Sequence, residues 1–398
     1  LVGSEMCIRD SHDRDRFPSW QMMLEWSGPT WSRTLHTVFI PSEKVWFPSG
    51  CSLCESKRIA CTHLLNPKEV EQMKAIVYTQ SGLPIHDPQS LYDAELPTPK
   101  PGARDLLVEV RAIAVNPVDT KVRASRGGEH PQVLGWDAVG VVREVGAEVT
   151  LFRPGDEVFY AGAIDRPGTY SELHVVDERI VGHKPRSLDN ASAAALPLTS
   201  ITAWELLFDR LGIEENGGKD QRLLVIGAAG GVGSILVQLA SKLTQLTVIG
   251  TASRPETQGW VKELGAHHVI DHSQSIPLQL EELKLNPVDY VISLTHTDTY
   301  LPQLVEVLRP QGKLALIDDP AQLDVMPLKR KSLSLHWELM FTRSLYRTED
   351  MIKQHQLLER VSQLIDGGVL RTTIGEHFGS INAENLKRAH SVLSLIHI

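Results

Sequence analysis

Residues 223–233 run Leu-Leu-Val-Ile-Gly-Ala-Ala-Gly-Gly-Val-Gly, and this stretch decides the fold of the chain. The four uncharged residues at its start predict a buried strand, and the glycines predict a tight turn that opens a helix. Glycines let a backbone approach a pyrophosphate closely, and a helix N-terminus offers unpaired N–H groups. We therefore predict a dinucleotide site here, the alternative being a purely structural turn. The expected binding residues are Gly227, Ala229, Gly230, Gly231, Val232 and Gly233.

The overall composition narrows the class of protein. The chain has 398 residues and a net charge of −9, from 40 basic and 49 acidic side chains. A chain of this length usually forms two domains. Its acidic balance opposes binding to nucleic acid or to anionic membranes, so we expect neither as a partner. No run of 18 apolar residues predicts a membrane span, and the first 30 residues lack a signal-peptide core. These features predict a cytoplasmic protein.

The first 72 residues differ from the rest of the chain. All four cysteines lie in this segment, and the composition changes abruptly at Met73. Three cysteines and one histidine there are ligand types that suit zinc, but the segment lacks the paired turns and apolar scaffold of a structural zinc site. These residues are Cys51, Cys54, Cys61 and His63. Because the segment has no periodicity, we predict that residues 1–72 form an unstructured or artefactual extension.

The remainder divides into a β-rich region and an alternating region. From Met73 to about residue 195, short strand patterns are separated by turns. After residue 196, strand and helix patterns alternate, as in residues 222–226 followed by residues 233–243. Such alternation predicts a parallel sheet covered on both faces by helices. A helical pattern over residues 348–365 leaves open whether the chain returns to the first domain or ends there.

The end of the second strand of the alternating region bears on the choice of cofactor. An acid at this point binds the ribose 2′-hydroxyl of NADH, whereas a basic residue with small hydroxyls accommodates the 2′-phosphate of NADPH. The chain has Ser253 and Arg254 here and no acid. We therefore predict NADPH, the alternative being that Arg254 is an ordinary solvated residue at a helix start.

Several segments besides the glycine turn share spacing with a known family. They are residues 116–119 (Asn-Pro-Val-Asp), 134–137 (Leu-Gly-Trp-Asp), 154–158 (Pro-Gly-Asp-Glu-Val) and 202–204 (Thr-Ala-Trp). From Met73 to about Leu393, the chain resembles the medium-chain dehydrogenase/reductase superfamily, specifically its quinone oxidoreductase (zeta-crystallin-like) branch. Members of that branch are often labelled zinc-type alcohol dehydrogenase-like.

The resemblance implies an α/β fold with two domains and an active site in the cleft between them. A GroES-like β-rich catalytic domain would comprise residues 73–195 and 341–398. A Rossmann domain with a doubly wound parallel sheet would comprise residues 196–340 and bind NADPH. Relatives of this branch are commonly homodimers.

The chain departs from the zinc-dependent members of that superfamily. In those members a Cys, a His and a second Cys hold the catalytic metal, and the resemblance places Asn116, Trp136 and Leu198 at these positions. None of the three can act as a thiolate or imidazole ligand. The four-cysteine structural zinc lobe is also missing, since no cysteine follows Cys61. We therefore expect an enzyme that works without metal.

Hydride transfer without a Lewis acid requires other groups to stabilise the developing oxyanion or enolate. We expect Asn116 to serve as a hydrogen-bond donor, the alternative being a turn residue before Pro117. Asp119 and Asp137 are expected to tune or relay a proton, although each could instead cap a turn or pair with an arginine. Tyr170 could donate a proton, but more simply packs in the β-rich domain.

Other residues are expected to border the cofactor and the substrate. The resemblance places Thr202 near the nicotinamide or its phosphates, and Leu294 is also expected to bind the cofactor. Trp136 is expected to fill the space that the metal occupies in other members. Met340 and Phe341 are expected to form walls of the substrate pocket, although ordinary core residues have the same character.

Together these patterns predict an NADPH-dependent, zinc-independent oxidoreductase. Quinones and α,β-unsaturated carbonyls are the expected small-molecule substrates, because they delocalise the electrons that they accept. One alternative is a zinc-type alcohol or aldehyde reductase, which would need metal ligands that the chain lacks after residue 72. The other alternative is a protein that binds NADPH without turnover.

Overall fold

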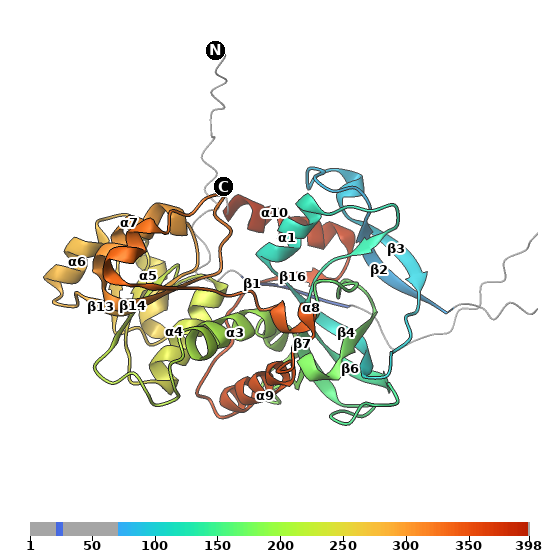
Figure 1. The fold of residues 1–398 in the computed structure, drawn as a ribbon. Helices are drawn as coiled ribbons and strands as arrows, with labels where there is room; N and C mark the ends of the chain where they lie inside the picture. Colours follow the sequence, from blue (N-terminus) through green and yellow to red (C-terminus); the bar gives the residue numbers. More distant parts are fainter. Residues whose placement is uncertain (1–20, 27–70, 397–398) are drawn as a thin grey trace, which may run out of the picture.

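The structure is a computed structural model that describes residues 21–26 and 71–396. Two sheets dominate it, and Figure 1 shows them on opposite sides of the molecule with helices α3 and α4 between them. One is a parallel sheet flanked by helices, and the other is a largely antiparallel sheet. A third sheet contains β3 (Tyr92–Pro97), β2 (Gln72–Tyr78) and β5 (Gln132–Val133).

The parallel sheet has the strand order β12-β11-β10-β13-β14-β15. The order reverses direction beside β10, which has β11 on one side and β13 on the other, each in parallel register. In open parallel sheets, ligands bind at the carboxyl ends of the strands next to such a reversal. The strands are β10 (Arg222–Ile226), β11 (Thr247–Thr251), β12 (His268–Ile270), β13 (Val288–Ser293), β14 (Leu308–Leu316) and β15 (Ser334–Trp337).

Both faces of the parallel sheet are buried. On β10, Leu223 and Val225 join one apolar core, while Leu224 and Ile226 join a second core on the opposite face. This alternation follows from the two-residue period of a strand. It explains why β10 is apolar at successive positions. The flanking helices are α4 (Gly231–Leu243), α5 (Pro255–Glu263), α6 (Ile276–Glu282) and α7 (Thr297–Val307).

The second large sheet has the order β16-β1-β4-β6-β7-β9, with β8 paired to β4. It forms the predicted β-rich region. Its strands are β1 (Gln21–Glu25), β4 (Asp105–Val115), β6 (Asp137–Val145), β7 (Glu157–Ala161), β8 (Leu173–Asp177), β9 (Val181–His183) and β16 (Ile374–Ser380).

For residues 21–25, strand β1 corrects the prediction of an unstructured extension. It pairs antiparallel with β4 and parallel with β16, and Met23 and Leu24 are fully buried. A strand of only five residues is stable here because β4 and β16, on its two sides, form hydrogen bonds with its backbone groups. The four cysteines and the zinc alternative lie outside the described residues.

Several of the remaining helices pack on the β-rich part of the protein. Residues beyond 340 return to the β-rich part, where α9 packs on β9 and α10 packs on β16 and β1. This settles the question that the helical pattern left open. The helices are α1 (Pro117–Ser125), α2 (Asn190–Ala194), α3 (Pro197–Trp204), α8 (Thr342–Tyr346), α9 (Ile352–Asp366) and α10 (Ala383–Ile396), with short turns η1 (Pro88–Ser90), η2 (Glu178–Ile180), η3 (Glu205–Arg210) and η4 (Met326–Lys331).

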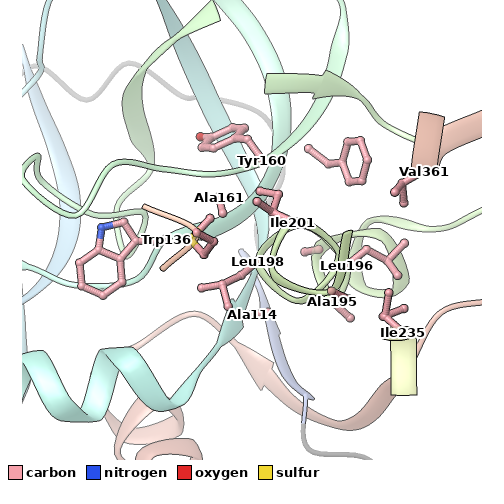
Figure 2. Close-up of a cluster of buried hydrophobic side chains, with 14 of the residues drawn as sticks. Ala114, Trp136, Tyr160, Ala161, Ala195, Leu196, Leu198, Ile201, Ile235 and Val361 are labelled. Carbon is pink, nitrogen blue, oxygen red and sulfur yellow. The ribbon is translucent and has the colours of Figure 1, made fainter. Parts of the chain in front are cut away.

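One helical stretch, Asn190–Arg210, is long and apolar enough to span a membrane by length and composition. It comprises α2, α3 and η3, and 78% of its most apolar window is buried inside the protein. Its apolar surface therefore packs against the protein's own core. Figure 2 shows Leu198 and Ile201 of α3, and Leu196 just before it, surrounded by buried residues of other elements, among them Ile235 of α4 and Val361 of α9.

Candidate active site

The predicted glycine turn joins β10 to α4. Gly227 has a φ of +78°, which L residues with a side chain rarely adopt, and Gly230 precedes the first residue of α4. A Cβ atom on Gly233 would lie 2.3 Å from the carbonyl oxygen of Gly227. This close approach explains the last glycine of the motif, since it packs the helix directly against the turn. The first turn of α4 thus presents free N–H groups at the reversal in strand order.

The ends of the neighbouring strands flank this turn. The hydroxyl oxygen of Thr251, the last residue of β11, accepts a hydrogen bond from the Gly227 N–H at 3.1 Å. On the other side, the Leu294 N–H donates to the carbonyl of Ile226 at 3.2 Å. Leu294 therefore borders the turn, and its contact with the cofactor stays a prediction. The sequence analysis missed Thr251, although a hydroxyl residue that ends the strand next to the turn is a usable signal.

Ser253 and Arg254 follow β11 directly. Ser253 is exposed, and Arg254 is the residue that precedes helix α5. Arg254 also accepts a hydrogen bond through its carbonyl from the hydroxyl of Thr257, at 2.9 Å. Arg254 therefore stands at the start of a helix. This is the position that the alternative interpretation, an ordinary solvated residue at a helix start, expected. Its position beyond the carboxyl end of β11 is also the one at which a basic residue can meet a 2′-phosphate.

Helix α3 connects the glycine turn to a second, polar cluster. A Cβ atom on Gly231 would lie 3.3 Å from the side chain of Thr199 and 3.5 Å from that of Gln21. Gln21 of β1 also donates to the Thr199 hydroxyl at 3.4 Å. Leu198, the residue before Thr199 on α3, contacts the polar cluster around Asp137. No signal in the sequence pointed to Gln21, because its place depends on the pairing of β1.

The polar cluster is centred on the buried carboxylate of Asp137. The Asn116 side-chain amide donates to Oδ2 of Asp137 at 2.8 Å, and the backbone N–H of Leu198 donates to Oδ1 at 2.7 Å. Asn116 is 2% exposed and Asp137 is fully buried. The structure therefore brings together Asn116 and Leu198, which the sequence placed 82 residues apart.

Asp119 lies behind Asn116 and supports it. Its Oδ2 accepts hydrogen bonds from the backbone N–H of Asn116 at 2.8 Å and from the Tyr170 hydroxyl at 2.9 Å. The Tyr170 hydroxyl also lies 3.2 Å from Nε2 of His390 on α10. Asp119 caps the first turn of α1 in this way, as its alternative interpretation required. Tyr170 is fully buried and packs in the β-rich part.

Burial shifts the protonation of this cluster. Desolvation raises the pKa of Asp119 to about 7, against the lowering effect of its two hydrogen-bond donors. Desolvation also raises the pKa of Asp137 well above its ordinary value. It lowers the pKa of His390 to about 3, so His390 is neutral at physiological pH. The cluster therefore contains a carboxyl group, Asp119, that changes protonation near neutrality.

The apolar residues expected around the substrate lie beside this cluster. The rings of Trp136 and Phe341 meet edge to face, with 5.7 Å between their centroids, and Met340 is 4% exposed. The Trp136 indole N–H donates to the carbonyl of Ala163 at 3.1 Å. Figure 2 shows Leu198 on the side of α3 that faces Trp136. Trp136 and Phe341 thus form an aromatic pair inside the buried core, where Trp136 directly precedes Asp137.

Thr202 lies one turn beyond Leu198 on α3. Its hydroxyl donates to the carbonyl of Leu198 at 2.8 Å, and the residue is 5% exposed. Because its only O–H is used within the helix, Thr202 can offer a ligand an oxygen lone pair. Its position on the helix that contacts both the glycine turn and Asp137 agrees with the location expected for it.

The site was tested for the metal that zinc-dependent members hold. Asn116, Trp136 and Leu198 offer an amide, an indole and an aliphatic side chain, and both oxygens of Asp137 accept hydrogen bonds. Among residues 21–26 and 71–396, no group of three or more His, Cys, Asp or Glu side chains is placed to hold a metal ion. The residues at these positions do not fit a catalytic zinc ion.

Comparison with known proteins identifies the family. Residues 102–186 match the alcohol dehydrogenase GroES-like domain, and residues 231–360 match the zinc-binding dehydrogenase family. A zinc-type alcohol dehydrogenase-like protein from Staphylococcus aureus is 40% identical over 306 residues, which cover 76% of this chain and 90% of that protein. The chain belongs to the medium-chain dehydrogenase/reductase superfamily. A mitochondrial NAD(P)H oxidoreductase from Homo sapiens is a more distant relative, 31% identical over 69% of this chain and 75% of its own.

Solved structures of this superfamily share the fold. A putative zinc-dependent alcohol dehydrogenase from Rhizobium etli is 54% identical, with a TM-score of 0.80 over 82% of this chain and 96% of that one. A quinone oxidoreductase from Pseudomonas syringae has 26% identity and a TM-score of 0.70, covering 82% and 97% of the two chains. A mycobacterial structure complexed with NADPH has 26% identity and a TM-score of 0.68, covering 81% and 96%.

Membership in the medium-chain dehydrogenase/reductase superfamily confirms the predicted fold class and the general activity. The protein is an NAD(P)H-dependent oxidoreductase with a GroES-like domain and a Rossmann-type parallel sheet. The predicted glycine turn, at the reversal of strand order in that sheet, is the part of the chain suited to the dinucleotide.

Proposed function

We propose that this protein reduces quinones or α,β-unsaturated carbonyls by hydride transfer from NADPH, without a catalytic zinc ion. The observation that carries the proposal is the set of side chains around Asp137. Where zinc-dependent members are expected to hold their metal, this chain has Asn116, Trp136 and Leu198, and Asp137 ties Asn116 to the backbone of Leu198. Charge on the substrate oxygen must then be stabilised by hydrogen bonds.

Different residues of the chain stabilise the charge on the substrate oxygen and exclude water from it. The bound dihydronicotinamide supplies the hydride. Asn116 has a second amide hydrogen beyond the one donated to Asp137, and it can donate to a substrate oxygen. Trp136 and Phe341 provide an apolar wall that excludes water, which strengthens such a hydrogen bond. Conjugated acceptors suit this arrangement because their negative charge is delocalised, so fewer donors are needed than for an isolated carbonyl.

The preference for NADPH rests on the residues after β11. Ser253 supplies a hydroxyl, Arg254 supplies a positive charge, and no acid stands there to bind the 2′-hydroxyl of NADH. The similar mycobacterial structure is a complex with NADPH. A cytoplasmic location and a homodimer remain predictions of the sequence.

The test is a steady-state assay of the full-length protein with NADPH or NADH and either a small quinone or an enone, followed by loss of the reduced nicotinamide. We expect oxidation that prefers NADPH and is insensitive to a chelator. Activity that disappears with the chelator and returns with zinc would overturn the zinc-independent chemistry. Tight NADPH binding without turnover on either class would instead support a protein that only binds the cofactor.

A further inference from the structure

Two buried glutamates lie where the chain crosses between the two large sheets. Glu205 begins η3, a π-helical turn that continues α3 three residues after Thr202. Glu338 follows β15 and precedes Met340 and Phe341. Both glutamate side chains are 0% exposed. They therefore stand between the helix that carries Thr202 and the segment that forms part of the proposed substrate wall.

Two arginines bind these carboxyl groups from outside. Arg343 donates through Nη1 to Oε1 of Glu205, and Arg210 donates through Nε to Oε2 of Glu338 at 2.6 Å. Arg210 also lies 3.8 Å from Oε2 of Glu205. Within the described part of the chain, Oε2 of Glu205 and Oε1 of Glu338 receive no N–H or O–H donor. Each buried carboxyl thus has one oxygen whose hydrogen bonding the arginines leave incomplete.

The charges around the pair do not balance without a proton. Arg343 also donates to Asp209 at 2.9 Å and to Asp350 at 3.0 Å, so four carboxyl groups share two guanidinium groups. Asp209 and Asp350 are 28% and 43% exposed, and solvent stabilises their charges. Glu205 and Glu338 have no such access. Two adjacent buried carboxylates repel strongly, and one proton both removes that repulsion and supplies the missing O–H donor.

We propose that Glu205 and Glu338 share one proton, and that this pair acts as a positioning device that holds α3 and the segment of residues 338–343 in register for turnover. Its effect on turnover rests on the function proposed above, because Thr202 and Phe341 are the residues that it would position. The proton itself follows from burial and geometry. It is consistent with burial and the charge of the neighbouring Glu338, which together raise the pKa of Glu205 to about 9.

Three further charged or titratable groups lie near the pair. Lys353, at the start of α9, lies 3.8 Å from Asp350. Burial lowers the pKa of His336 of β15, and the positive charges of Lys313 and Arg210 lower it further. His336 is therefore neutral when Glu205 titrates. The proton shared by the glutamates is the protonation event expected at this crossing above neutral pH.

The direction of the pH effect follows from linkage. The ordinary pKa of glutamate is 4.5, and that of Glu205 in the folded protein is raised to about 9. Between these values the folded protein keeps a proton that the unfolded chain has lost, so this pair makes stability fall as pH rises across that window. Above about pH 9 the proton leaves and the carboxylates repel. In Glu205→Gln, a neutral side-chain amide provides an N–H donor in place of the carboxyl O–H. This donor does not dissociate at high pH.

The proton is tested by infrared spectroscopy on the full-length protein, using the C=O stretch that distinguishes a carboxylic acid from a carboxylate. The spectrum of wild type minus Glu205→Gln at neutral pH should contain one carboxylic-acid band, which disappears as pH rises through about 9. Glu263→Gln is the matched control, since Glu263 pairs at 3.0 Å with Arg371 at an exposed site. A difference spectrum without a carboxylic-acid band would overturn the shared proton.

The positioning role is tested by turnover across the same pH range. Wild type should lose kcat above about pH 9, whereas Glu205→Gln should keep it and Glu205→Ala should lose roughly 10- to 100-fold at neutral pH. Equal pH profiles for wild type and Glu205→Gln, or full turnover in Glu205→Ala, would overturn the positioning role. If wild type reduces neither quinone nor enone, the proposed function fails, while the infrared band still decides the shared proton.

Discussion

The side-chain amide of Asn116 donates to Asp137, with 2.8 Å between Nδ2 and Oδ2. The other carboxyl oxygen of Asp137 holds the backbone N–H of Leu198, so one buried group fixes both an amide and the start of α3. An amide held in this way has a defined orientation before any substrate arrives. Such preorganised donors stabilise developing charge more effectively than mobile ones.

Substitution of Asn116 tests this arrangement. Asn116→Ala removes the proposed donor to the substrate and leaves Asp137 with one donor fewer, so we expect kcat to fall by about 100-fold or more. NADPH affinity should stay near the wild-type value, because the glycine turn is unaffected. Steady-state kinetics and equilibrium NADPH titration of the same preparation measure the two quantities. An unchanged kcat would show that Asn116 is only a helix-capping residue.

Arg254 is expected to discriminate between the two cofactors. Arg254→Ala should raise KM for NADPH by roughly 10-fold or more, since a charge-assisted hydrogen bond to a phosphate contributes about 1.5–3 kcal/mol. KM for NADH should change little. Arg153→Ala is the control, because that arginine is 87% exposed and pairs with Asp156 in its own turn. Equal effects of Arg254→Ala on both cofactors would contradict the predicted preference.

The glycine turn offers a matched pair of glycine-to-alanine variants. A Cβ atom at Gly233 would meet the carbonyl oxygen of Gly227 at 2.3 Å, so Gly233→Ala should destabilise the protein by about 1–3 kcal/mol and weaken NADPH binding. At Gly259, inside α5, a Cβ atom would meet nothing within 4 Å. Gly259→Ala should be neutral or stabilise by up to about 1 kcal/mol. Urea unfolding of both variants checks the contrast.

The buried Tyr170–Asp119 contact predicts a pH-dependent loss of stability. The folded-state pKa of Asp119 is raised to about 7 from 3.8, so stability falls as pH rises between these values. Tyr170→Phe removes a donor to the carboxylate, which raises this pKa further. The variant should therefore lose about 1–3 kcal/mol at pH 8 and less at about pH 5.

Tyr290→Phe provides the control for that measurement. The Tyr290 hydroxyl donates at 3.3 Å to the neutral side chain of Gln221, so its loss should cost the same at both pH values. Urea unfolding at the two pH values compares the variants. A pH-independent cost for Tyr170→Phe would mean that Asp119 does not titrate in this range.

Strand β1 should contribute substantially to stability. Leu24 is fully buried, so Leu24→Ala should cost about 2–5 kcal/mol, whereas Leu278→Ala at a 61% exposed leucine should cost less than about 0.5 kcal/mol. A chain that begins at Met73 should lose more, because β1 is the strand with which β16 pairs. Thermal unfolding of these three variants tests the role of β1. Wild-type stability of the shortened chain would show that the strand is dispensable.

Local patterns predicted the parallel sheet well because its strands and helices are specified by neighbouring residues. Arg222–Ile226 has the predicted bounds, and the α4 helix begins at Gly231, two residues before the predicted start. The difference arises because the motif's glycines already belong to the first helical turn. The same local logic placed Gly227 in the turn, where the structure gives it a φ of +78°.

The polar cluster could be predicted only in part. Family resemblance pointed to Asn116, Asp119 and Asp137, but not to the hydrogen bonds that join them. The contact of Tyr170 with His390 links residues 220 apart, and no local pattern encodes it. Likewise β1 has no periodicity of its own beyond five residues, and its register is determined by strands β4 and β16. Such pairings depend on the tertiary fold, which a single sequence does not reveal residue by residue.

The position of β1 also sets the order in which the protein can assemble during synthesis. Gln21–Glu25 leaves the ribosome early, yet β16, one of its two partners, spans Ile374–Ser380 near the other end of the chain. A loop of this length loses conformational entropy when it closes, before the contacts between β1 and β16 compensate for that loss. This entropy cost slows folding. The parallel sheet, whose strands all lie within residues 222–337, can form first. The β-rich sheet, by contrast, is completed only after residues 374–380 have been synthesised.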